Sequence, residues 1–507
     1  MTTELAAPLT TPAPPDARAR SNRRRLVVAV LVLTALLRLP AFFVDVFNSD
    51  ETFLATQAQV IRNGGSLYED ATDRKPPLVP YLYAATFALV GSTALWSVRV
   101  AAMLAVALTA LLLAAEARRR WGDRAAWIGA LLFVAASVAF APQDGQAANF
   151  EVFMLPAMTA AFLLAARDHP RSSGFAVAIA TLAKQTGAAT LIPILYLAWK
   201  HRGRHGLTAT LGAFAIPLAV VALLVGPGDL IFWAATGNGS YFGLGSATAY
   251  VMGLFAVMTF AFIACNLPIV WTIPTAWRRR VRGQDTDLWL WLLSASLSVA
   301  VGLRFFGHYY LQLLPPLCLI SAGALAQRAD RVVKGTIAFA LTAAAGFTVV
   351  GFVARPWGDE PKYQRVSQYL ERHLRKTDRV FVWGHEPEIY WASGALPGTR
   401  FLSDGFVNGN WGGRPPGDTS SDSPTPGARE MLMEDLQLRR PRYILDTTPA
   451  AFRGSQYHPM DSIPELQRYV DRGYRYVRKI DEIAVYERRD LGQVTAKAAK
   501  ASRAHDE

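Results

Sequence analysis

The sequence predicts a polytopic α-helical membrane protein that ends in a small α/β domain. Of its 507 residues, 52% are hydrophobic and only 18% are charged, whereas a soluble domain typically has about 25% charged residues. The charged residues cluster and leave stretches such as 26–37, 101–115 and 335–354 free of charge. Because a helix needs about 20 mostly apolar residues to cross a bilayer, these stretches indicate membrane spans.

The membrane part is predicted over residues 26–354, with about 11–13 spans. A disordered cytoplasmic arm rich in Thr, Ala and Pro is expected over residues 1–25, ahead of a first span at 26–44. The span at 174–199 is expected to be broken, because Lys184 lies in its middle. The other predicted spans cover residues 77–91, 95–116, 125–141, 150–166, 207–226, 250–274, 287–303, 309–327 and 335–354.

The net charge of +13 does not indicate a nucleic-acid partner, because the basic clusters lie at the ends of apolar segments. Such clusters hold loops on the cytoplasmic side of a plasma membrane. Arg23–Arg25 therefore places the N-terminus in the cytoplasm and residues 45–76 in the first extracytoplasmic loop. Strict alternation of the predicted spans puts Arg118–Arg120 outside, against this rule. Either a span is miscounted near residues 77–95 or this short loop is an exception.

From residue 355 the composition becomes that of a soluble domain. Helical and strand-like segments alternate over residues 355–489, with strands expected near 379–383, 399–402, 443–445, 474–479 and 483–487. This alternation indicates a small α/β domain. Residues 490–507 are expected to form a disordered tail.

Two neighbouring acids, Asp50 and Glu51, follow the first span. The simplest interpretation is structural: Ser49 or Asp50 caps a short amphipathic helix that lies in the membrane interface, where acids favour the helix start. The alternative is that the pair carries chemistry. The apolar face of this helix would consist of Phe53, Leu54, Ala58 and Ile61.

The end of the same loop favours the functional alternative. Lys75 stands directly before Pro76 and Pro77, which open the next apolar segment. A lysine at this place is either an anchor whose ammonium reaches the interface or a cation that faces a lipid phosphate. Six short motifs can be considered together: Asp50-Glu51, Gly65-x-Leu67-Tyr68, Lys75-Pro76-Pro77-Leu78, Gly91 with Arg99, Arg304-Phe-Phe-Gly-His308-Tyr309-Tyr310-Leu-Gln312-Leu-Leu-Pro315-Pro316, and Val382-Trp383-Gly384.

In their order and spacing these motifs resemble the protein O-mannosyltransferase and aminoarabinose-transferase group of GT-C membrane glycosyltransferases, over about residues 25–400. The resemblance implies an enzyme that takes a sugar from a polyprenyl-phosphate donor and inverts its configuration. It also implies an extracytoplasmic active site under the first loop and a soluble domain on the same side. The acceptor would be a hydroxyl of a protein, glycan or lipid.

The chemistry of such a transfer assigns a role to each candidate. Displacement at an anomeric carbon passes through an oxocarbenium-like state, and it needs a carboxylate for the acceptor proton and cations for the departing phosphate. Asp50 is the candidate base, while Glu51 positions the acceptor or, with Asp50, a divalent metal; metal dependence stays open. Lys75 is the candidate for the donor phosphate. Tyr68, Arg304 and His308 are expected to assist it.

A second polar group is expected to line the site. Asp144, Asn149 and Glu151 lie at the mouth of a span, and Lys184 lies within one. Such residues beside apolar helices are unfavourable unless they face a cavity or a partner. They are either cap residues with a structural hydrogen bond or part of an active-site lining.

A different class of function stays open on the sequence. A transporter or flippase of lipid-linked precursors would also use broken helices and an intramembrane lysine, but paired halves are not evident. His385-Glu386 in the soluble domain suggests a helix start rather than a metal site. We therefore expect the soluble domain to recognise the acceptor or to support the site.

Overall fold

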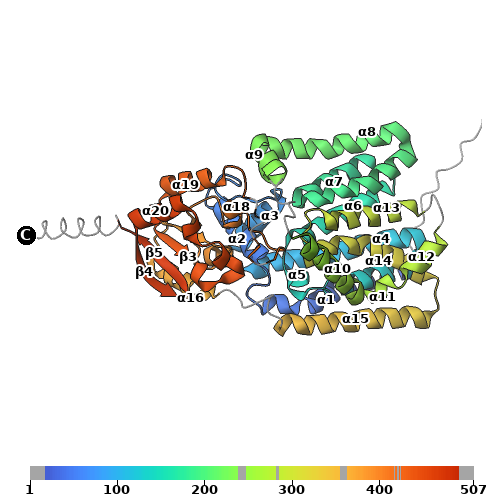
Figure 1. The fold of residues 1–507 in the computed structure, drawn as a ribbon. Coiled ribbons are helices and arrows are strands. Elements are labelled where there is room, and N and C mark those ends of the chain that lie inside the picture. The colour runs from blue at the N-terminus through green and yellow to red at the C-terminus, as the bar shows by residue number, and fades with distance from the viewer. Residues whose placement is uncertain are drawn as a thin grey trace, which may run out of the picture.

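A computed structural model describes residues 17–237, 247–280, 285–353 and 362–489, apart from 416, 419–421 and 423. These residues form a bundle of long helices with a smaller α/β domain at one end (Figure 1). Residues 1–16 of the predicted arm and the predicted tail over residues 490–507 lie outside the described residues.

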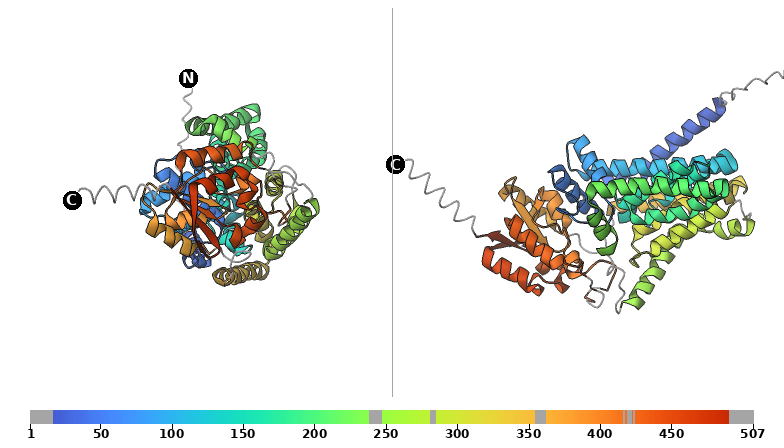
Figure 2. Two further views of the ribbon diagram at one scale, coloured as in Figure 1. Left: turned by 60° about the vertical axis from the view of Figure 1, so that its left-hand side comes forward. Right: turned by 90° about the horizontal axis from the view of Figure 1, so that it is seen from above.

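The bundle is built from helices that run roughly along one axis, as the view from above also shows (Figure 2). Short helices join them at both ends of the bundle. The long helices are α1 (Ala17–Leu37), α4 (Leu95–Ala136), α6 (Phe150–Ala165), α7 (Pro170–Ala183), α8 (Leu191–Val225), α10 (Thr248–Cys265), α13 (Thr286–Ala300), α14 (Leu314–Ala326) and α15 (Asp330–Val353). The short ones include η1 (Leu39–Phe42), α2 (Ser49–Arg62), α3 (Leu78–Val90), α5 (Pro142–Gln146), η2 (Gln185–Thr190), α9 (Pro227–Ala234), α11 (Leu267–Val270), α12 (Ile273–Arg279) and η4 (Gly307–Leu313).

The first span differs from the prediction at both ends. Residues 17–25, expected in the arm, are already helical, and α1 ends at Leu37 rather than near residue 44. The predicted boundary follows hydropathy, whereas the polar first turns continue the same helix. Pro40 ends it, because proline cannot continue the hydrogen-bonding of a preceding helix.

Two long helices turn back on themselves. In α4 the turn is at Gly122, with φ 84°, and in α8 it is at Gly203, with φ 54°. Glycine adopts this left-handed region without the steric penalty of a Cβ. The predicted break inside 174–199 is confirmed, because α7 ends at Ala183, η2 follows, and α8 begins at Leu191.

The segment α3 does not cross the bundle, although the sequence predicts a span at 77–91. Just before α3, the Lys75 ammonium faces Asp50 at the end that carries the α/β domain. Just after it, the Thr93 carbonyl accepts a hydrogen bond of 2.9 Å from the indole of Trp391 in that domain. Both ends of α3 therefore lie on the same side, and its apolar composition reflects packing rather than crossing.

This correction removes the conflict over Arg118–Arg120. The indole of Trp127, just after the turn in α4, donates a hydrogen bond of 3.0 Å to Asn22 beside Arg23–Arg25. The two basic clusters thus lie at the same end, opposite the α/β domain. We count eleven passes in the described residues, since the loss of α3 is offset by the separation of α7 from the first half of α8.

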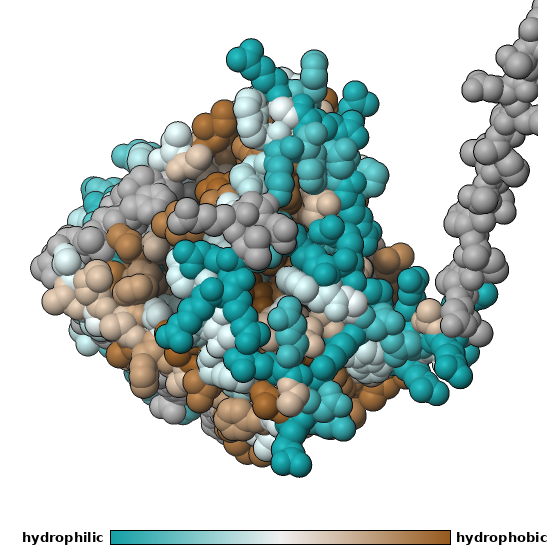
Figure 3. Space-filling model, turned by 90° about the vertical axis from the view of Figure 1, so that its right-hand side faces the viewer, coloured by the Kyte–Doolittle hydropathy of each residue, from teal (hydrophilic) through white to brown (hydrophobic). Residues whose placement is uncertain are grey.

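The end face opposite the α/β domain is polar. Figure 3 views this face and shows hydrophilic residues across it, with hydrophobic residues around its lower and left edges. The sides of the bundle expose apolar side chains such as Leu104, Leu224 and Phe260. Among the residues that the structure describes, five helices are long and apolar enough to cross a membrane, and three further apolar helices are shorter. The protein is therefore a multi-pass membrane protein.

The α/β domain contains one mixed sheet with strand order β2-β1-β3-β5-β4. Strand β1 pairs in parallel with β2 and β3, while β5 pairs antiparallel with β3 and β4. Four of the five predicted strands are confirmed. Residues 399–402, expected as a strand, form a loop, in which the Arg400 carbonyl binds the Thr72 amide of the first loop instead of a neighbouring strand. The strands are β1 (Arg379–Trp383), β2 (Leu396–Pro397), β3 (Tyr443–Asp446), β4 (Tyr474–Ile480) and β5 (Ile483–Arg488). The α-helices of the domain are α16 (Tyr363–His373), α17 (Pro387–Ser393), α18 (Gly405–Asn408), α19 (Ala428–Arg439) and α20 (Pro464–Gly473). The short 3-10 helices are η6 (Thr448–Ala450), η7 (Phe452–Tyr457) and η8 (Met460–Ser462).

The α/β domain covers α2. The Gln59 amide donates to the Trp391 carbonyl at 3.2 Å, and the backbone amide of Thr72 donates to the Arg400 carbonyl at 2.8 Å. Thr56, Gln57 and Gln59 of α2 are consequently buried. Helix α2 therefore lies between the bundle and the α/β domain, where it presents its first turn to the junction.

Candidate active site

The predicted amphipathic helix is present as α2, but its cap is Asn48 rather than Ser49 or Asp50. The Asn48 side chain accepts a hydrogen bond of 2.9 Å from the Asp50 amide, which satisfies a free donor of the first turn. The Asp50 carboxylate is thereby released from capping. It points to Lys75, whose Nζ lies 3.3 Å from Oδ2, and both side chains keep 24% of their surface exposed.

The electrostatic surroundings keep Asp50 ionised. Burial by itself raises the pKa of this carboxyl, but the charges of Lys75, His308, Lys184 and His385 act in the opposite direction and lower the pKa to about 2. Four groups from separate parts of the chain thus converge on one carboxylate. In this state Asp50 is a fixed negative charge and a weak proton acceptor.

Glu51 has a different environment, although it is the next residue. Its side chain is fully buried and forms two hydrogen bonds with Arg99, at 2.9 Å to Oε1 and 2.7 Å to Oε2. The backbone amides of Phe47 and Ala148 donate to the same carboxylate. Arg99 also donates to three carbonyls of the preceding loop, those of Ala41, Val44 and Asp45. The Glu51–Arg99 pair therefore fastens the loop to α4.

Lys75 is held from two sides. The buried Tyr68 hydroxyl donates to the Lys75 carbonyl at 2.9 Å, so Tyr68 positions the backbone of Lys75. The ammonium itself lies 4.1 Å from the centre of the Phe150 ring, a contact that attracts a cation to the ring face. The lysine is therefore well ordered while its charge still faces Asp50.

Asp144 and His308 meet beside this pair. Asp144 Oδ1 lies 2.9 Å from His308 Nδ1, and it accepts a hydrogen bond of 2.9 Å from Asn48, the cap of α2. A Cβ at Gly307 would lie 2.4 Å from Asp144 Oδ2, so only glycine fits between them. The Asn149 amide donates to the Asp144 carbonyl at 3.3 Å. Asp144 and His308, which lie far apart in the sequence, thus form one hydrogen-bonded network with Asn48 of the first loop.

Glu151 and Lys184 continue the network into the bundle. Both are buried and form an ion pair, and Glu151 Oε1 lies 3.9 Å from His308 Nε2. The second oxygen, Oε2, is buried with no hydrogen-bond partner in the structure. The Lys184 ammonium also lies 3.9 Å from the centre of the Tyr309 ring. A buried carboxylate oxygen without a partner is unfavourable and is open to a ligand group.

Arg304 lies elsewhere. Its guanidinium is buried and donates to the carbonyls of Trp411 and Gly412, at 2.9 and 3.0 Å, in a loop of the α/β domain. Arg74 lies beneath the same loop, 3.3 Å from the centre of the Trp411 ring. Arg304 therefore joins the two parts of the molecule next to the site, rather than facing Lys75.

The sequence analysis did not select four residues that the structure brings to the site. Arg99 and Asn48 fix the first loop, and Asp73 is a buried carboxyl whose pKa is raised by burial. His385 of the α/β domain places Nε2 3.2 Å from the Ser49 hydroxyl and stacks on Phe53. Of these four residues, only Arg99 could have been found from the sequence, because it belongs to the motif of Gly91 with Arg99. The other three are brought to the site only by the tertiary fold.

The site offers no obvious metal centre. Among the described residues there is no group of three or more His, Cys, Asp or Glu side chains arranged to hold a metal ion. Asp50 and Glu51 face different partners, Lys75 and Arg99. We therefore assign no residue to a metal and derive no step through one.

Comparisons with known proteins agree with this picture. Residues 74–233 match the model of the dolichyl-phosphate-mannose-protein mannosyltransferase family. The fold is similar to that of ArnT from Cupriavidus metallidurans bound to undecaprenyl phosphate, with TM-score 0.61 and 13% identity over 93% of this chain and 98% of that one. No curated protein matches the chain by sequence.

Two archaeal structures share the fold over less of their own length. The Archaeoglobus fulgidus oligosaccharyltransferase tethered with an acceptor peptide has TM-score 0.53 and 12% identity, over 90% of this chain and 72% of that one. The oligosaccharyltransferase AglB from the same organism, in complex with an inhibitory peptide and a dolichol-phosphate, has TM-score 0.52 and 13% identity, over 91% and 73%. The family match over residues 74–233 and the shared fold confirm the predicted resemblance to GT-C membrane glycosyltransferases of the protein mannosyltransferase and aminoarabinose-transferase type.

Proposed function

We propose that the protein transfers a sugar from a polyprenyl-phosphate donor to a hydroxyl of an extracytoplasmic acceptor, with Asp50 as the base and Lys75 as the phosphate ligand. The observation that carries this proposal is the Asp50–Lys75 pair at 3.3 Å, one-quarter exposed at the junction of bundle and α/β domain. Two of the similar structures named above bind a lipid phosphate: ArnT binds undecaprenyl phosphate and AglB binds a dolichol-phosphate. Family likeness and local charge thus support the same donor class.

The ion pair suggests how the base is activated. A donor phosphate that approaches Lys75 competes with Asp50 for the ammonium, because a phosphate is also a strong acceptor for this cation. As Lys75 turns to the phosphate, one of the charges that lower the pKa of Asp50 moves away. The pKa then rises toward its ordinary value, and the carboxylate becomes a better proton acceptor.

The transfer is a single displacement. The acceptor oxygen bonds to the anomeric carbon on the face opposite the phosphate while the carbon–oxygen bond to the phosphate breaks. The acceptor proton passes to Asp50, and the phosphate, still attached to the polyprenyl chain, leaves with the bonding electron pair on its oxygen. Lys75 stabilises the charge on the departing phosphate, and the configuration at the anomeric carbon inverts.

The remaining residues have positioning roles in this proposal. Glu51 and Arg99 hold the loop that carries Asp50, and Tyr68 holds Lys75. Asp144 and Asn149, together with His308, Glu151 and Lys184, form the inner wall, where Glu151 Oε2 is open to a sugar hydroxyl. Arg304 ties the α/β domain over the site. By the positive-inside rule, the basic end of the bundle is cytoplasmic, which places the site outside.

The test uses the purified full-length protein with polyprenyl-phosphate mannose and measures the release of polyprenyl phosphate. We expect Asp50→Asn to lower the rate by about a thousandfold, the range of a lost general base together with its charge. Glu69→Gln is the matched control, because Glu69 is an exposed acid of the same loop; it should keep the wild-type rate. Movement of the intact lipid across a bilayer without release of the sugar would favour a flippase and reject the transferase.

A further inference from the structure

A second polar pocket lies in the α/β domain, away from the candidate active site. It has a volume of about 640 Å³ and is bounded by α19, α20 and the outer ends of β4 and β5. In Figure 1, β4, β5 and α20 lie at the end of the α/β domain away from the bundle, while α19 lies closer to it. A volume of this size is typical of a ligand site. None of its lining residues belongs to the Asp50 network.

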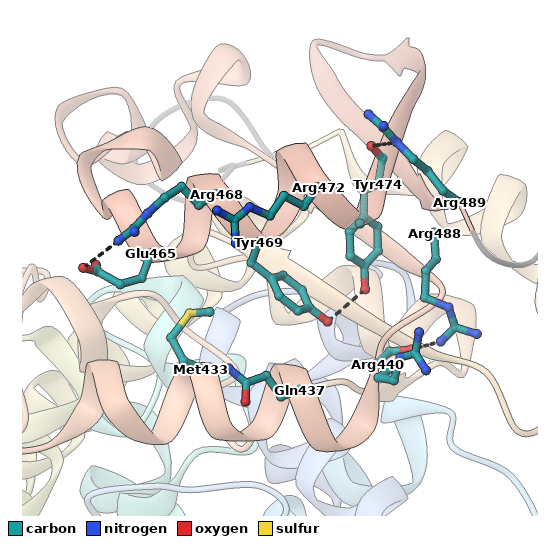
Figure 4. A pocket seen from close by; sticks show the side chains of 11 residues that line it. Met433, Gln437, Arg440, Glu465, Arg468, Tyr469, Arg472, Tyr474, Arg488 and Arg489 are labelled. Carbon is teal, nitrogen blue, oxygen red and sulfur yellow. Dashed lines mark hydrogen bonds and ion pairs between the residues drawn. The ribbon is translucent and has the colours of Figure 1, made fainter.

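The lining is strongly basic. Five arginines contribute to it, and Glu465 is the single acid among the lining residues, all of which are in the described part of the chain. Figure 4 shows Arg468 and Arg472 along α20, with Arg440 and Arg488 at the opposite end of the pocket. The arginines are Arg440, Arg468, Arg472, Arg488 and Arg489.

The helix dipole explains the positions of only some of these arginines. Arg440 and Arg472 lie at the C-terminal ends of α19 and α20, where a cation is favoured by the helix dipole. Arg468 is in the middle of α20, and Arg488 and Arg489 follow β5, so no helix dipole places them there. Arg488 and Arg489 donate to backbone carbonyls, those of Arg440 and Tyr474. These hydrogen bonds orient the two guanidinium groups.

Two tyrosine rings lie between the arginines. The Tyr469 hydroxyl donates to the Leu436 carbonyl and the Tyr474 hydroxyl donates to the Pro441 carbonyl, each at 2.7 Å. The rings are therefore fixed, and Tyr469, which is half-buried, presents a rigid contact surface at little entropic cost. Such a surface with flanking guanidinium groups suits a molecule that combines flat apolar patches with anionic groups.

We propose that this pocket binds an anionic saccharide segment of the acceptor, in which phosphate or carboxylate groups face the arginines and a sugar ring lies on Tyr469. Guanidinium groups recognise both anions through paired hydrogen bonds. The inference rests on the proposed function, because it assumes an extracytoplasmic acceptor. The distance of the pocket from the bundle favours a polymer over a membrane lipid, since a polymer can reach both this pocket and Asp50.

The test measures binding to the full-length protein, separately from sugar transfer. The probes are an oligogalacturonate, a phosphorylated oligomannose, an uncharged oligomannose and an oligoglutamate. We expect at least one acidic saccharide to bind, and the double variant Arg468→Gln/Arg472→Gln to weaken this binding by about tenfold or more, as the loss of two charged contacts implies. The control Arg475→Gln/Lys479→Gln removes two exposed charges of β4 outside the pocket and should bind as wild type does.

Equal binding of the acidic saccharide by wild type and the Arg468/Arg472 variant would overturn the proposal. Equal binding of the uncharged oligomannose, or of oligoglutamate, by wild type would do so as well. Thermal unfolding of both double variants shows that they are folded. If wild type binds the acidic saccharide but releases no polyprenyl phosphate, the proposed function fails while the anion site remains. If wild type releases polyprenyl phosphate but does not bind the acidic saccharide, the anion site fails while the proposed function remains.

Discussion

Two charged clusters lie at opposite ends of the bundle, and they differ in how completely their charges are matched. At the polar end, Glu116 receives hydrogen bonds from Arg119 and Arg120, and Arg120 also binds both oxygens of Asp287. At the other end, Asp50 has one cation at 3.3 Å, and Glu151 Oε2 has no partner. At the polar end the carboxylate oxygens are paired with arginines, whereas the Asp50 end leaves carboxylate oxygens that can accept hydrogen bonds from a ligand.

The comparison teaches that buried charge alone does not mark a site. Burying a charge is unfavourable unless it is paired, and removing one partner of a buried pair is strongly destabilising. The Glu116 cluster satisfies this condition and so has a structural explanation. The Asp50 network satisfies it only in part, and such incomplete matching is typical of functional sites.

The largest expected effect is a difference in the free energy of unfolding between variants of the two clusters. Glu116→Gln leaves Arg119 and Arg120 with weaker partners, and we expect the free energy of unfolding to fall by about 2–3 kcal/mol, as for lost charged hydrogen bonds. Asp50→Asn removes a carboxylate that is one-quarter exposed, so its unfolding should change much less. Thermal unfolding in detergent measures both. A stable Glu116→Gln protein, or an unfolded Asp50→Asn protein, would contradict the comparison.

A second effect concerns the donor. Lys75→Met removes the proposed phosphate ligand but keeps the length of the side chain, so we expect the KM for the polyprenyl-phosphate sugar to rise by about tenfold to a hundredfold. Lys75→Arg keeps the charge and should recover part of the loss. Initial rates at several donor concentrations measure the change. An unchanged KM in Lys75→Met would remove Lys75 from the site.

The smallest effect concerns pH and the contact between His385 and Ser49. Burial and the nearby Arg453 lower the pKa of His385 to about 4, against the opposing charges of Glu388 and Asp50. A lowered histidine pKa means that the unfolded chain binds the proton more readily. The contribution of this group to stability is therefore complete above about pH 6.5, the ordinary histidine pKa, and decreases as the pH falls toward 4.

His385→Gln should reduce this pH dependence, because glutamine does not titrate. The difference in melting temperature between wild type and His385→Gln, measured between pH 7.5 and pH 5, isolates His385 from Asp404, whose pKa of about 6 acts in the opposite direction. Parallel curves for the two proteins would show that His385 does not contribute.

Much of the membrane part could be predicted from the sequence, because lipid exposure requires long apolar segments. The prediction of a membrane span at α3 was wrong because an apolar helix packed between protein layers has the same composition as a membrane-spanning helix. Similarly, Asp50 and Lys75 were found through their motifs, but the different role of Glu51 depends on Arg99, which follows it by 48 positions. The contact of His385 with Ser49 spans 336 positions, and no local pattern indicates it.

The position of α2 also has a consequence for biosynthesis. Helix α2 is made early, yet its partners in the α/β domain, Pro387 and Trp391, are more than 300 positions later in the chain. Until those residues emerge, the polar side of α2 has only water or lipid headgroups as partners. Contacts between such distant positions form slowly, so the nascent protein remains incomplete until the α/β domain has been made and folded.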